Sequence, residues 1–504
     1  MTEYHLARLA AATLDRLGDY QSLYFDGDWY TTGEQYARAV RVSAGLRKLG
    51  VVPGSRVVVI MANCPEVTAT YVALWHAGAV VTPAIFLVTA PELRHILVDS
   101  GAVAVVTTVE LLPKVREAAA GLDMPIVVVA AGDVDGVVDY AELESADPGE
   151  LVDRSADDLA ALLYTGGTTG RSKGVPLTHQ NLIDGGGAAR SVSHVEGINR
   201  GILALPLAHS FGILVTVGGM HAPERPVTIL QRWFDPAGWP GLAQEHRVQA
   251  AAVVPSMLAM LLAQPLEEYD LSALRFLHCG AAPLPAALVH EIERRVPSVT
   301  VMEGYGCTET AGIISATPPQ HRKLGTVGKP VPGVHLRIVA PDGTDAAAGT
   351  DGEVVVRGPN VMAGYWKEQP GESSLVDGWF ATGDIGRLDE DGYLSIVDRK
   401  KDLIIRGGYN VYPRDVEDVL LTHPAVAGAA VVGRPDDRLG EEVVAFIALR
   451  SGQTATPEEL TGFAKENLAA TKYPRDIRVV DAIPLTSVGK VDRKRLRALL
   501  AGHQ

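Results

Sequence analysis

Short apolar runs alternate with segments of helical periodicity through the first quarter of the chain. Apolar runs at 57–61, 80–82 and 103–107 predict buried strands, and the spacing of apolar residues at 67–77 and 92–98 predicts helices between them. Strands that alternate with helices build parallel sheets whose faces those helices cover. The sequence therefore predicts an α/β fold rich in parallel sheet.

Two helices have their starts marked in the sequence. Thr32 and Gln35 have the spacing of a capping box, and apolar or small residues follow at helical spacing until Gly50 ends the helix. Near the other end of the chain, Thr456 and Glu459 have the same spacing, with a proline directly after the threonine. A helix is therefore expected after each threonine.

The pattern of predicted secondary structure changes from about residue 327. Short strands at 335–339, 352–357 and 393–397 are separated by Pro-Gly and Asp-Gly turns, which favours a small antiparallel subdomain over 327–397. A charged run, DRKKD, occupies 398–402 and precedes a compact α+β module. We expect an N-terminal domain over 1–397, a hinge at 398–402 and a C-terminal domain over 403–504.

Composition limits the classes of function. At 504 residues the chain is expected to form two or more domains, and its 45 basic against 60 acidic residues give a net charge of −15. That charge disfavours nucleic acid or an anionic membrane as the main partner. No segment has the length and apolarity of an integral membrane helix, and Cys64, Cys279 and Cys307 form no disulfide framework. A cytoplasmic protein is expected, with its oligomeric state open.

A glycine-rich segment follows the apolar run at 159–163. Residues 164–174 read YTGGTTGRSKG, with four glycines, three threonines, one arginine and one lysine. Glycine lets backbone N–H groups approach an anion without a Cβ in the way, while threonine adds hydroxyls and lysine adds charge. The GxxxxGK[ST] spacing of a P-loop is absent. The segment predicts a polyphosphate cradle of another kind, with an ordinary glycine-rich turn as the alternative.

Five further polar motifs are spread along the chain. They read LPLAHSFG at 205–212, GAAPL at 280–284 with EGYGCTE at 303–309, TGD at 382–384, DRKKD to RGGYN at 398–410, and PLTSVGK at 484–490. In these motifs Tyr305 offers a flat face for adenine, Thr308 a hydroxyl for a phosphate, and Glu309 a hard oxygen for Mg²⁺. The carboxylate of Asp384 suits a pair of ribose hydroxyls.

The first of these motifs also allows a different interpretation. Its A-x-S-x-G spacing around Ser210 is close to the nucleophile elbow of hydrolases, which would make Ser210 a nucleophile. That interpretation leaves the glycine-rich segment and the later motifs unexplained.

The six motifs together, in their order and spacing, resemble the adenylate-forming superfamily of acyl-CoA synthetases, 4-coumarate–CoA ligases, luciferases and peptide-synthetase adenylation domains. The resemblance covers about residues 24–499. It implies a large N-terminal domain of two parallel-rich sheets with a small antiparallel subdomain, and a small mobile C-terminal domain. It also implies an AMP-forming acid–thiol ligase that uses ATP and CoA as co-substrates and Mg²⁺ as its metal ion.

The resemblance assigns a role to each motif. Thr165, Thr168 and Lys173 match residues that hold the β and γ phosphates, with Glu309 and Thr165 at Mg²⁺. Further matches to the ATP and AMP site are Gly166, Gly167, Thr169, Gly280, Ala281, Ala282, Glu303, Gly304, Tyr305, Gly306, Cys307, Asp384, Ile396 and Arg399. Gly166 stands where the family usually has serine, Ser172 where it has proline, Ala208 where it has an aromatic residue, and Leu485 where it often has a basic residue.

The resemblance also implies two half-reactions. Lys490 matches the lysine that contacts the acyl carboxylate and the α-phosphate, with Thr308 and His209 beside the reacting groups. Lys401 matches the pivot of the small domain. Gly407, Gly408 and Tyr409 match the segment that lies against the pantetheine arm of CoA, or of a phosphopantetheine carrier protein.

The acyl pocket is expected around His209, Ser210, Gly212, Ile213 and Gly218. No acidic residue follows the second motif, which disfavours an α-amino acid, and 302–304 offers no cation for a small dicarboxylate. A medium- or long-chain fatty acid or an aryl-alkanoic acid is expected. The alternatives are an acyl-AMP ligase that loads a carrier protein, a luciferase-like oxygenase, the hydrolase above, and a catalytically silent nucleotide-binding protein.

Overall fold

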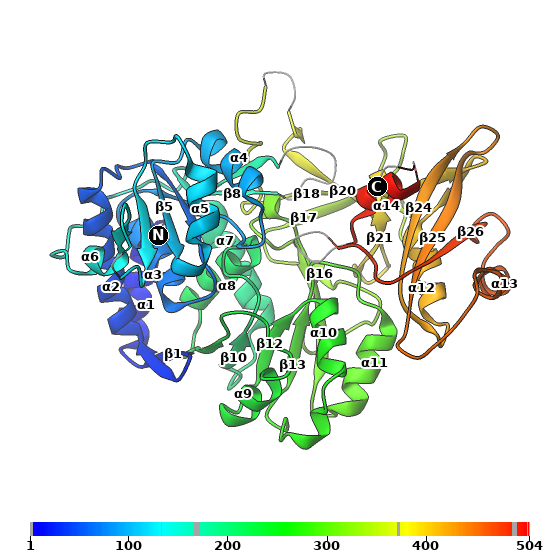
Figure 1. The fold of residues 1–504 in the computed structure, drawn as a ribbon, viewed down its shortest axis with the longest axis horizontal. Helices are drawn as coiled ribbons and strands as arrows, with labels where there is room; N and C mark the ends of the chain where they lie inside the picture. Colours follow the sequence, from blue (N-terminus) through cyan, green and yellow to red (C-terminus); the bar gives the residue numbers. More distant parts are fainter. Residues whose placement is uncertain are drawn as a thin grey trace.

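The computed structural model describes residues 4–132, 134–165, 172–369, 373–485, 491–500 and 502. Four β-sheets organise this part of the chain, two of them large and covered by helices and two smaller (Figure 1). The predicted α/β class is confirmed, with parallel-rich sheets, an antiparallel subdomain and a small C-terminal domain.

The first sheet has seven strands in the order β7-β6-β5-β3-β4-β8-β9, all parallel except β9. Along β3, Val57 and Val59 face one hydrophobic core and Val58 and Ile60 face another, so both faces are buried. The strands are β3 (Arg56–Ile60), β4 (Val80–Pro83), β5 (Ala104–Thr108), β6 (Ile126–Val129), β7 (Val138–Asp139), β8 (Leu159–Tyr164) and β9 (Gly174–Thr178). The helices around them are α2 (Thr32–Lys48), α3 (Pro65–His76), α4 (Ala90–Ser100), α5 (Leu112–Ala119) and α6 (Tyr140–Glu144), with the short η1 (Val109–Leu111).

The second sheet has nine strands in the order β16-β15-β14-β13-β12-β10-β11-β1-β2, with parallel pairing from β14 to β1. They are β1 (Gln21–Phe25), β2 (Asp28–Thr31), β10 (Arg200–Leu203), β11 (Val227–Leu230), β12 (Ala250–Val253), β13 (Phe276–Cys279), β14 (Thr300–Tyr305), β15 (Ser315–Ala316) and β16 (Lys329–Pro330). One face packs on a core that includes residues of α9 (Trp239–Glu245), α10 (Pro255–Leu262), η2 (Leu266–Glu268) and α11 (Ala286–Arg295).

Helices α7 (His179–Ser193) and α8 (Ser210–Met220) join the two large sheets. Leu182 of α7 and Val217 of α8 belong to one hydrophobic core with Leu163 of the first sheet and Leu203 of the second. Helix α1 (Leu6–Leu17) contributes Leu6 to the same core. The two sheets are therefore held together through a shared layer of helices.

The antiparallel subdomain and the C-terminal module follow. The third sheet is built from β17 (His335–Val339), β18 (Gly352–Arg357), β19 (Leu375–Val376), β20 (Trp379–Leu388) and β21 (Leu394–Arg399). The fourth, orange to red in Figure 1, contains β22 (Ile404–Arg406), β23 (Tyr409–Val411), β24 (Val426–Asp436), β25 (Gly440–Leu449) and β26 (Asp476–Val480). Its helices are α12 (Pro413–Leu421), α13 (Pro457–Asn467) and α14 (Arg493–Leu500). No helix in the described ranges combines the length and apolarity needed to cross a bilayer.

One of the two predicted helix starts is wrong by a single residue. The capping box is formed by Thr31 and Glu34, because β2 runs to Thr31 and leaves that residue extended at the helix start. The hydroxyl of Thr32 donates instead to the carbonyl of Gly18, at 3.0 Å. The predicted box of Thr456 and Glu459 is confirmed.

Close packing of α7 on α8 depends on Gly186. A Cβ at this position would lie 2.6 Å from Cγ1 of Val217 and 3.0 Å from the backbone N of Gly218. Gly219 in α8 is a natural control, since a Cβ there would meet no heavy atom within 4 Å. The two glycines therefore separate the effect of a clash from the intrinsic effect of glycine in a helix.

We expect Gly186→Ala to lower the free energy of unfolding by about 1–3 kcal/mol, because the added methyl overpacks the helix contact. Gly219→Ala should raise it by about 0.5–1 kcal/mol, because alanine loses less backbone entropy on folding. Urea unfolding of both variants measures the two effects. Equal shifts of the same sign would contradict the proposed role of Gly186.

Candidate active site

A cavity of about 2200 Å³ lies among the motifs that the sequence singles out. It is bordered by the ends of strands β13 and β14, by α8 and by the start of the C-terminal module. The predicted site residues that line it are Thr165, Lys173, His209, Ser210, Gly218, Gly280, Ala281, Ala282, Glu303, Gly304, Tyr305, Gly306, Cys307, Thr308, Glu309, Asp384, Ile396, Arg399 and Lys401.

The two ends of the glycine-rich segment are fixed by a strand pair. Strands β8 and β9 are antiparallel, and the N–H of Thr165 donates to the carbonyl of Lys173 at 3.1 Å. Tyr164 donates its hydroxyl to Asp99 at 2.6 Å, which ties the end of β8 to helix α4. The predicted phosphate contacts at Gly166, Gly167, Thr168 and Thr169 lie outside the described residues.

Lys173 and Glu309 meet through a residue that the sequence motifs do not include. The ammonium of Lys173 lies 4.7 Å from the ring centre of Tyr365, whose hydroxyl donates to Glu309 at 2.8 Å. No local sequence signal marks Tyr365. Its neighbour Trp366 donates to the carbonyl of Asp99, at 3.1 Å, so the same chain segment also contacts helix α4.

The arrangement around Glu309 suits Mg²⁺ only together with phosphate oxygens. Within the described residues, no group of three or more His, Cys, Asp and Glu side chains is placed to hold a metal ion. Mg²⁺ is commonly bound by one or two carboxylates together with nucleotide phosphates. The single carboxylate of Glu309, at the cavity wall in the turn η3 (Thr308–Thr310), fits that mode of binding.

The carboxylate of Asp384 joins three strands. Its side chain is only 6 % exposed, and it accepts the hydroxyl of Tyr305 at 2.5 Å and pairs with Nε of Arg399 at 2.7 Å. Tyr305 ends β14, Asp384 lies in β20, and Arg399 ends β21. The structure thus brings together a tyrosine, an aspartate and an arginine from motifs that are 79 and 15 residues apart.

Glycines let the backbone of the motifs pack closely at this end of the sheet. A Cβ on Gly280 would lie 2.9 Å from the carbonyl oxygen of Gly304, and one on Gly306 would lie 2.4 Å from that of Gly312. Ala281 adopts a φ of +68°, a conformation that alanine rarely takes. These residues form a tight backbone surface next to Tyr305.

Glu303 is a carboxyl with unusual electrostatics. Burial raises its pKa to about 7, against the opposing influence of Arg414 and Arg322. Burial also raises the pKa of Cys279 to about 12, with the charge of Glu303 acting in the same direction. At neutral pH the Glu303 side chain is therefore partly protonated.

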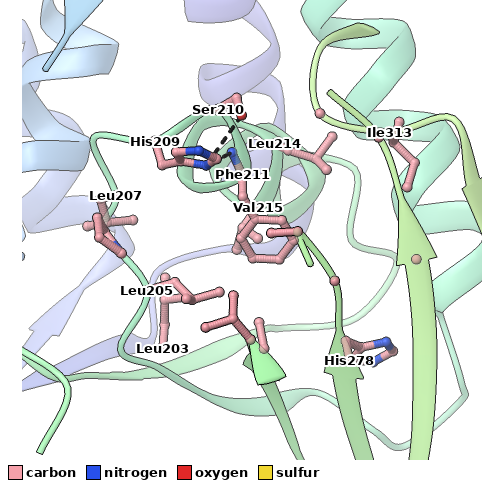
Figure 2. A pocket seen from close by; sticks show the side chains of 18 of the residues that line it. Leu203, Leu205, Leu207, His209, Ser210, Phe211, Leu214, Val215, His278 and Ile313 are labelled. Atoms are coloured by element: carbon pink, nitrogen blue, oxygen red, sulfur yellow. Dashed lines mark hydrogen bonds between the residues drawn. The ribbon is translucent and has the colours of Figure 1, made fainter. Parts of the chain in front are cut away.

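His209 caps helix α8 at the cavity wall. Its Nδ1 accepts the backbone N–H of Phe211 at 3.3 Å and lies 3.3 Å from the hydroxyl of Ser210 (Figure 2). Phe211, Leu214 and Val215 continue from it along the pocket (Figure 2). Ser210 begins a helix and is buried, so it lacks the exposed position that a hydrolase nucleophile elbow requires.

Two residues expected in the acyl pocket are corrected by the structure. Ile213 is buried in the core between the sheets, and neither Ile213 nor Gly212 lines the cavity. A Cβ on Gly212 would lie 2.2 Å from the carbonyl oxygen of Leu207, so this glycine permits a backbone contact instead. Residues 210–220 are apolar on every side, and a pattern of that kind does not reveal which face borders a cavity.

The predicted hinge is held from both sides. Asp398 is buried and accepts the backbone N–H of Arg414, at the start of α12, at 2.9 Å. Asp402 is buried and pairs with Arg497 of α14 at 3.0 Å. Lys401 lies between these anchors in the turn η4 (Lys400–Asp402), and burial lowers its pKa, with the charge of Arg399 adding to the effect.

The residues assigned to CoA lie away from the cavity. Gly407 and Gly408, with φ of +58° and +81°, form the two-residue turn between β22 and β23. Tyr409 beside them is 62 % exposed. Lys490 lies outside the described residues.

Comparison with known proteins identifies the family. The model of the AMP-binding enzyme family matches residues 10–366, and that of the AMP-binding enzyme C-terminal domain matches residues 415–490. The chain belongs to the AMP-binding enzyme family. Together with the relatives named below, these matches confirm the predicted adenylate-forming superfamily, of acyl-CoA synthetase type.

Similar proteins include two curated relatives and a solved structure. A feruloyl-CoA synthase from Amycolatopsis sp. is 36 % identical over 94 % of this chain and 94 % of its own. A long-chain-fatty-acid–CoA ligase from Bacillus subtilis is 32 % identical over 95 % of this chain and 92 % of its own. ATP-bound MatB from Rhodopseudomonas palustris has a TM-score of 0.90 at 32 % identity, over 99 % of this chain and 100 % of its own. The predicted enzyme class, AMP-forming acid–thiol ligase, is confirmed.

The ion pair of Asp384 should matter for stability and for nucleotide binding. We expect Asp384→Asn to lower the free energy of unfolding by about 2–3 kcal/mol, because it leaves Arg399 without its anionic partner. Asp345→Asn breaks an exposed pair with Arg337 and should cost less than about 1 kcal/mol. Urea unfolding and calorimetric titration with ATP test both variants. Equal losses in the two would contradict the assignment.

Glu303 should give a pH-dependent stability difference. Its folded-state pKa of about 7 lies above the ordinary 4.5, so the folded protein keeps a proton that the unfolded chain releases. Wild-type stability is therefore lost as pH rises through this interval, and a neutral glutamine avoids the loss. We expect Glu303→Gln to gain stability over wild type between about pH 4.5 and 7, reaching about 1–3 kcal/mol above it.

Urea unfolding at several pH values measures this difference, with the exposed Glu268→Gln as control for the loss of a charge. A difference between wild type and Glu303→Gln that stays constant from pH 4.5 to 8 would show that Glu303 is not protonated in the folded state.

Proposed function

We propose that this enzyme activates a carboxylic acid with ATP to an acyl adenylate and then transfers the acyl group to the thiol of CoA. The observation that carries the proposal is that Asp384 contacts both Tyr305 and Arg399 in the cavity. His209 lines the same cavity. In it, Tyr305 would stack on adenine and Asp384 would accept the ribose hydroxyls. Thr165 and Lys173 would hold phosphates at the other border of the cavity.

The first half-reaction needs no general base. A carboxylic acid has a pKa of about 4–5 and is ionised at neutral pH. Its oxygen attacks the α-phosphorus, a bond from that phosphorus to the bridging oxygen breaks, and pyrophosphate leaves. The barrier lies in bringing anions together, so Lys490 and Thr308 would supply positive charge and a hydrogen bond. Mg²⁺ at Glu309 supplies further charge to the phosphates when bound.

The second half-reaction needs a different arrangement of the small domain. The thiol attacks the acyl carbon, and AMP leaves with the electron pair of the broken carbon–oxygen bond. Gly407, Gly408 and Tyr409 lie outside the cavity in this arrangement, so domain 403–504 would rotate about the hinge 398–402, with Lys401 as pivot, to bring them to the acyl adenylate.

The body of the acid is expected to be apolar. Phe211, Leu214 and Val215 line the pocket beyond His209, with Gly218 leaving room further along α8. Feruloyl-CoA synthase and long-chain-fatty-acid–CoA ligase are among the similar proteins. An aryl-alkanoic or a medium- to long-chain fatty acid fits these walls. Relatives named as CoA ligases favour CoA over a carrier protein as the acceptor.

The proposal is tested by screening acids for pyrophosphate release, with and without CoA. Release that requires the acid establishes adenylation, and a thioester product establishes CoA as the acceptor. Release without any thioester, together with acylation of a phosphopantetheine carrier, would reject CoA. Absence of release with every acid would reject the proposed function.

Two variants should separate the half-reactions. Lys490→Ala should lower acyl-adenylate formation by about 100-fold or more, because one lost transition-state contact costs about 3–4 kcal/mol. It should leave thioester formation from supplied acyl-AMP largely intact. Lys401→Pro should do the reverse, because a fixed φ restricts the rotation. Unchanged pyrophosphate release in Lys490→Ala would remove Lys490 from the site, and equal loss of both steps in Lys401→Pro would reject the hinge.

A further inference from the structure

Arg190, at the wall of the cavity, is a half-buried cation, and two of its buried nitrogen atoms have no partner among the described residues. It lies in the last turn of α7, and its Nε and Nη2 are buried and make no hydrogen bond to any described residue. Burial lowers its pKa, and the charge of Glu224 acts in the opposite direction. Glu224 itself receives the backbone N–H of Gly197 at 3.2 Å, and no ion pair joins it to Arg190 within the described part of the chain.

The floor of the cavity near this residue is made of small side chains. Gly201 of β10 pairs with Ala250 of β12, and Ala252 pairs with His278 of β13. Side chains alternate along a strand, so Gly201, Ala250 and Ala252 share one face with His278. All of them line the cavity together with Arg190. Small residues on this face leave space between the sheet and helices α7 and α8.

His278 adds a second polar group to the same region. It lies across the pocket from His209 and Ser210 (Figure 2) and makes no hydrogen bond within the described residues. Burial lowers its pKa to about 4, and the positive charge of Arg190 acts in the same direction. The imidazole is therefore neutral at pH 7, with one nitrogen able to donate.

The relative orientation of Nε and Nη2 of Arg190 indicates which chemical group would pair with them. Nε–H and the Nη2 amino group lie on one edge of a guanidinium and donate in parallel, which matches the two oxygens of a carboxylate. A buried unpaired charge is costly, and an oxygen acceptor that reaches it removes part of that cost. Nothing else in the described part of the molecule supplies that acceptor.

We propose that Arg190, assisted by His278, binds an oxygen acceptor at the far end of the substrate acid, remote from the carboxylate that is activated. This inference rests on the proposed function and specifies its substrate class. His278 precedes Gly280 by two residues, which is about 7 Å along an extended strand. The substrate would therefore carry its acceptor, a carboxylate or a carbonyl, about one ring length beyond the reacting group.

Three acids of one shape test the proposal: 3-(4-carboxyphenyl)propanoate, 3-(4-acetylphenyl)propanoate and the apolar 3-(4-isopropylphenyl)propanoate. We expect wild-type kcat/KM for pyrophosphate release to be at least about 10-fold higher with an oxygenated acid than with the isopropyl acid, because an apolar group leaves the guanidinium unpaired. Arg190→Met should abolish or reverse that preference, mainly by raising activity on the isopropyl acid and lowering it on the oxygenated ones. Arg275→Met, at an exposed arginine just before β13, is the control and should retain the wild-type preference.

Thermal unfolding without ligand separates a binding role from a structural one. Arg190→Met should have a Tm equal to or above that of wild type, because it removes a charge whose buried Nε and Nη2 make no hydrogen bond to any described residue. A fall in Tm, or an equal change in kcat/KM for all three acids, would overturn the proposal. So would a wild-type preference for the isopropyl acid, or failure with all three acids while other acids are activated. Failure with every acid would instead reject the proposed function.

Discussion

A buried carboxylate at the meeting point of two sheets is the interaction on which the site depends. Asp384 is buried, and a buried carboxylate needs partners that stabilise its charge. It finds them in Tyr305, at the end of the nine-stranded sheet, and in Arg399, at the end of β21. Because β21 leads directly into the turn at Lys401, this one ion pair also fixes where the C-terminal module begins. The proposed ribose contact and the start of the proposed hinge therefore involve the same group.

A second constraint comes from the layer of helices between the large sheets. Gly186 allows α7 to approach α8 closely. On the sheet, Gly201, Ala250 and Ala252 have side chains that extend little from the sheet surface. The small residues of β10 and β12 leave part of the cavity between the sheet and the helices α7 and α8. The space is apolar near Phe211 and polar at His278 and Arg190. Under the proposal above, a substrate would meet apolar side chains along its body and hydrogen-bond donors at its far end.

Local patterns predicted most of the fold and the motifs of the site, and they failed where packing decides. Strands β17 and β18 have the predicted bounds, because alternation and Pro-Gly or Asp-Gly turns are local signals. Asp384 and Tyr305 were marked by their motifs. Arg190 and His278 were not, because the fold brings them to one cavity from α7 and from β13, almost ninety residues later in the chain. The prediction that Ile213 lines the pocket is wrong for the converse reason, because a helix that is apolar all round gives no sign of which face meets the cavity.

The negative net charge of the protein disfavours anionic substrates, and residues of the cavity offset this effect locally. A chain of net charge −15 must admit a nucleotide and an acid that are both anionic. Part of the answer is local cations, since Lys173, Arg190 and Arg399 all line the cavity. The other part is that burial raises the pKa of Glu303, which lines the cavity, to about 7, so this carboxyl is partly protonated at neutral pH. A buried glutamic acid that stays partly neutral repels an incoming phosphate less than an ionised surface carboxylate would, and it can donate a hydrogen bond as well. Burial of Glu303 thus makes the cavity less negative than a count of its ionisable residues would suggest.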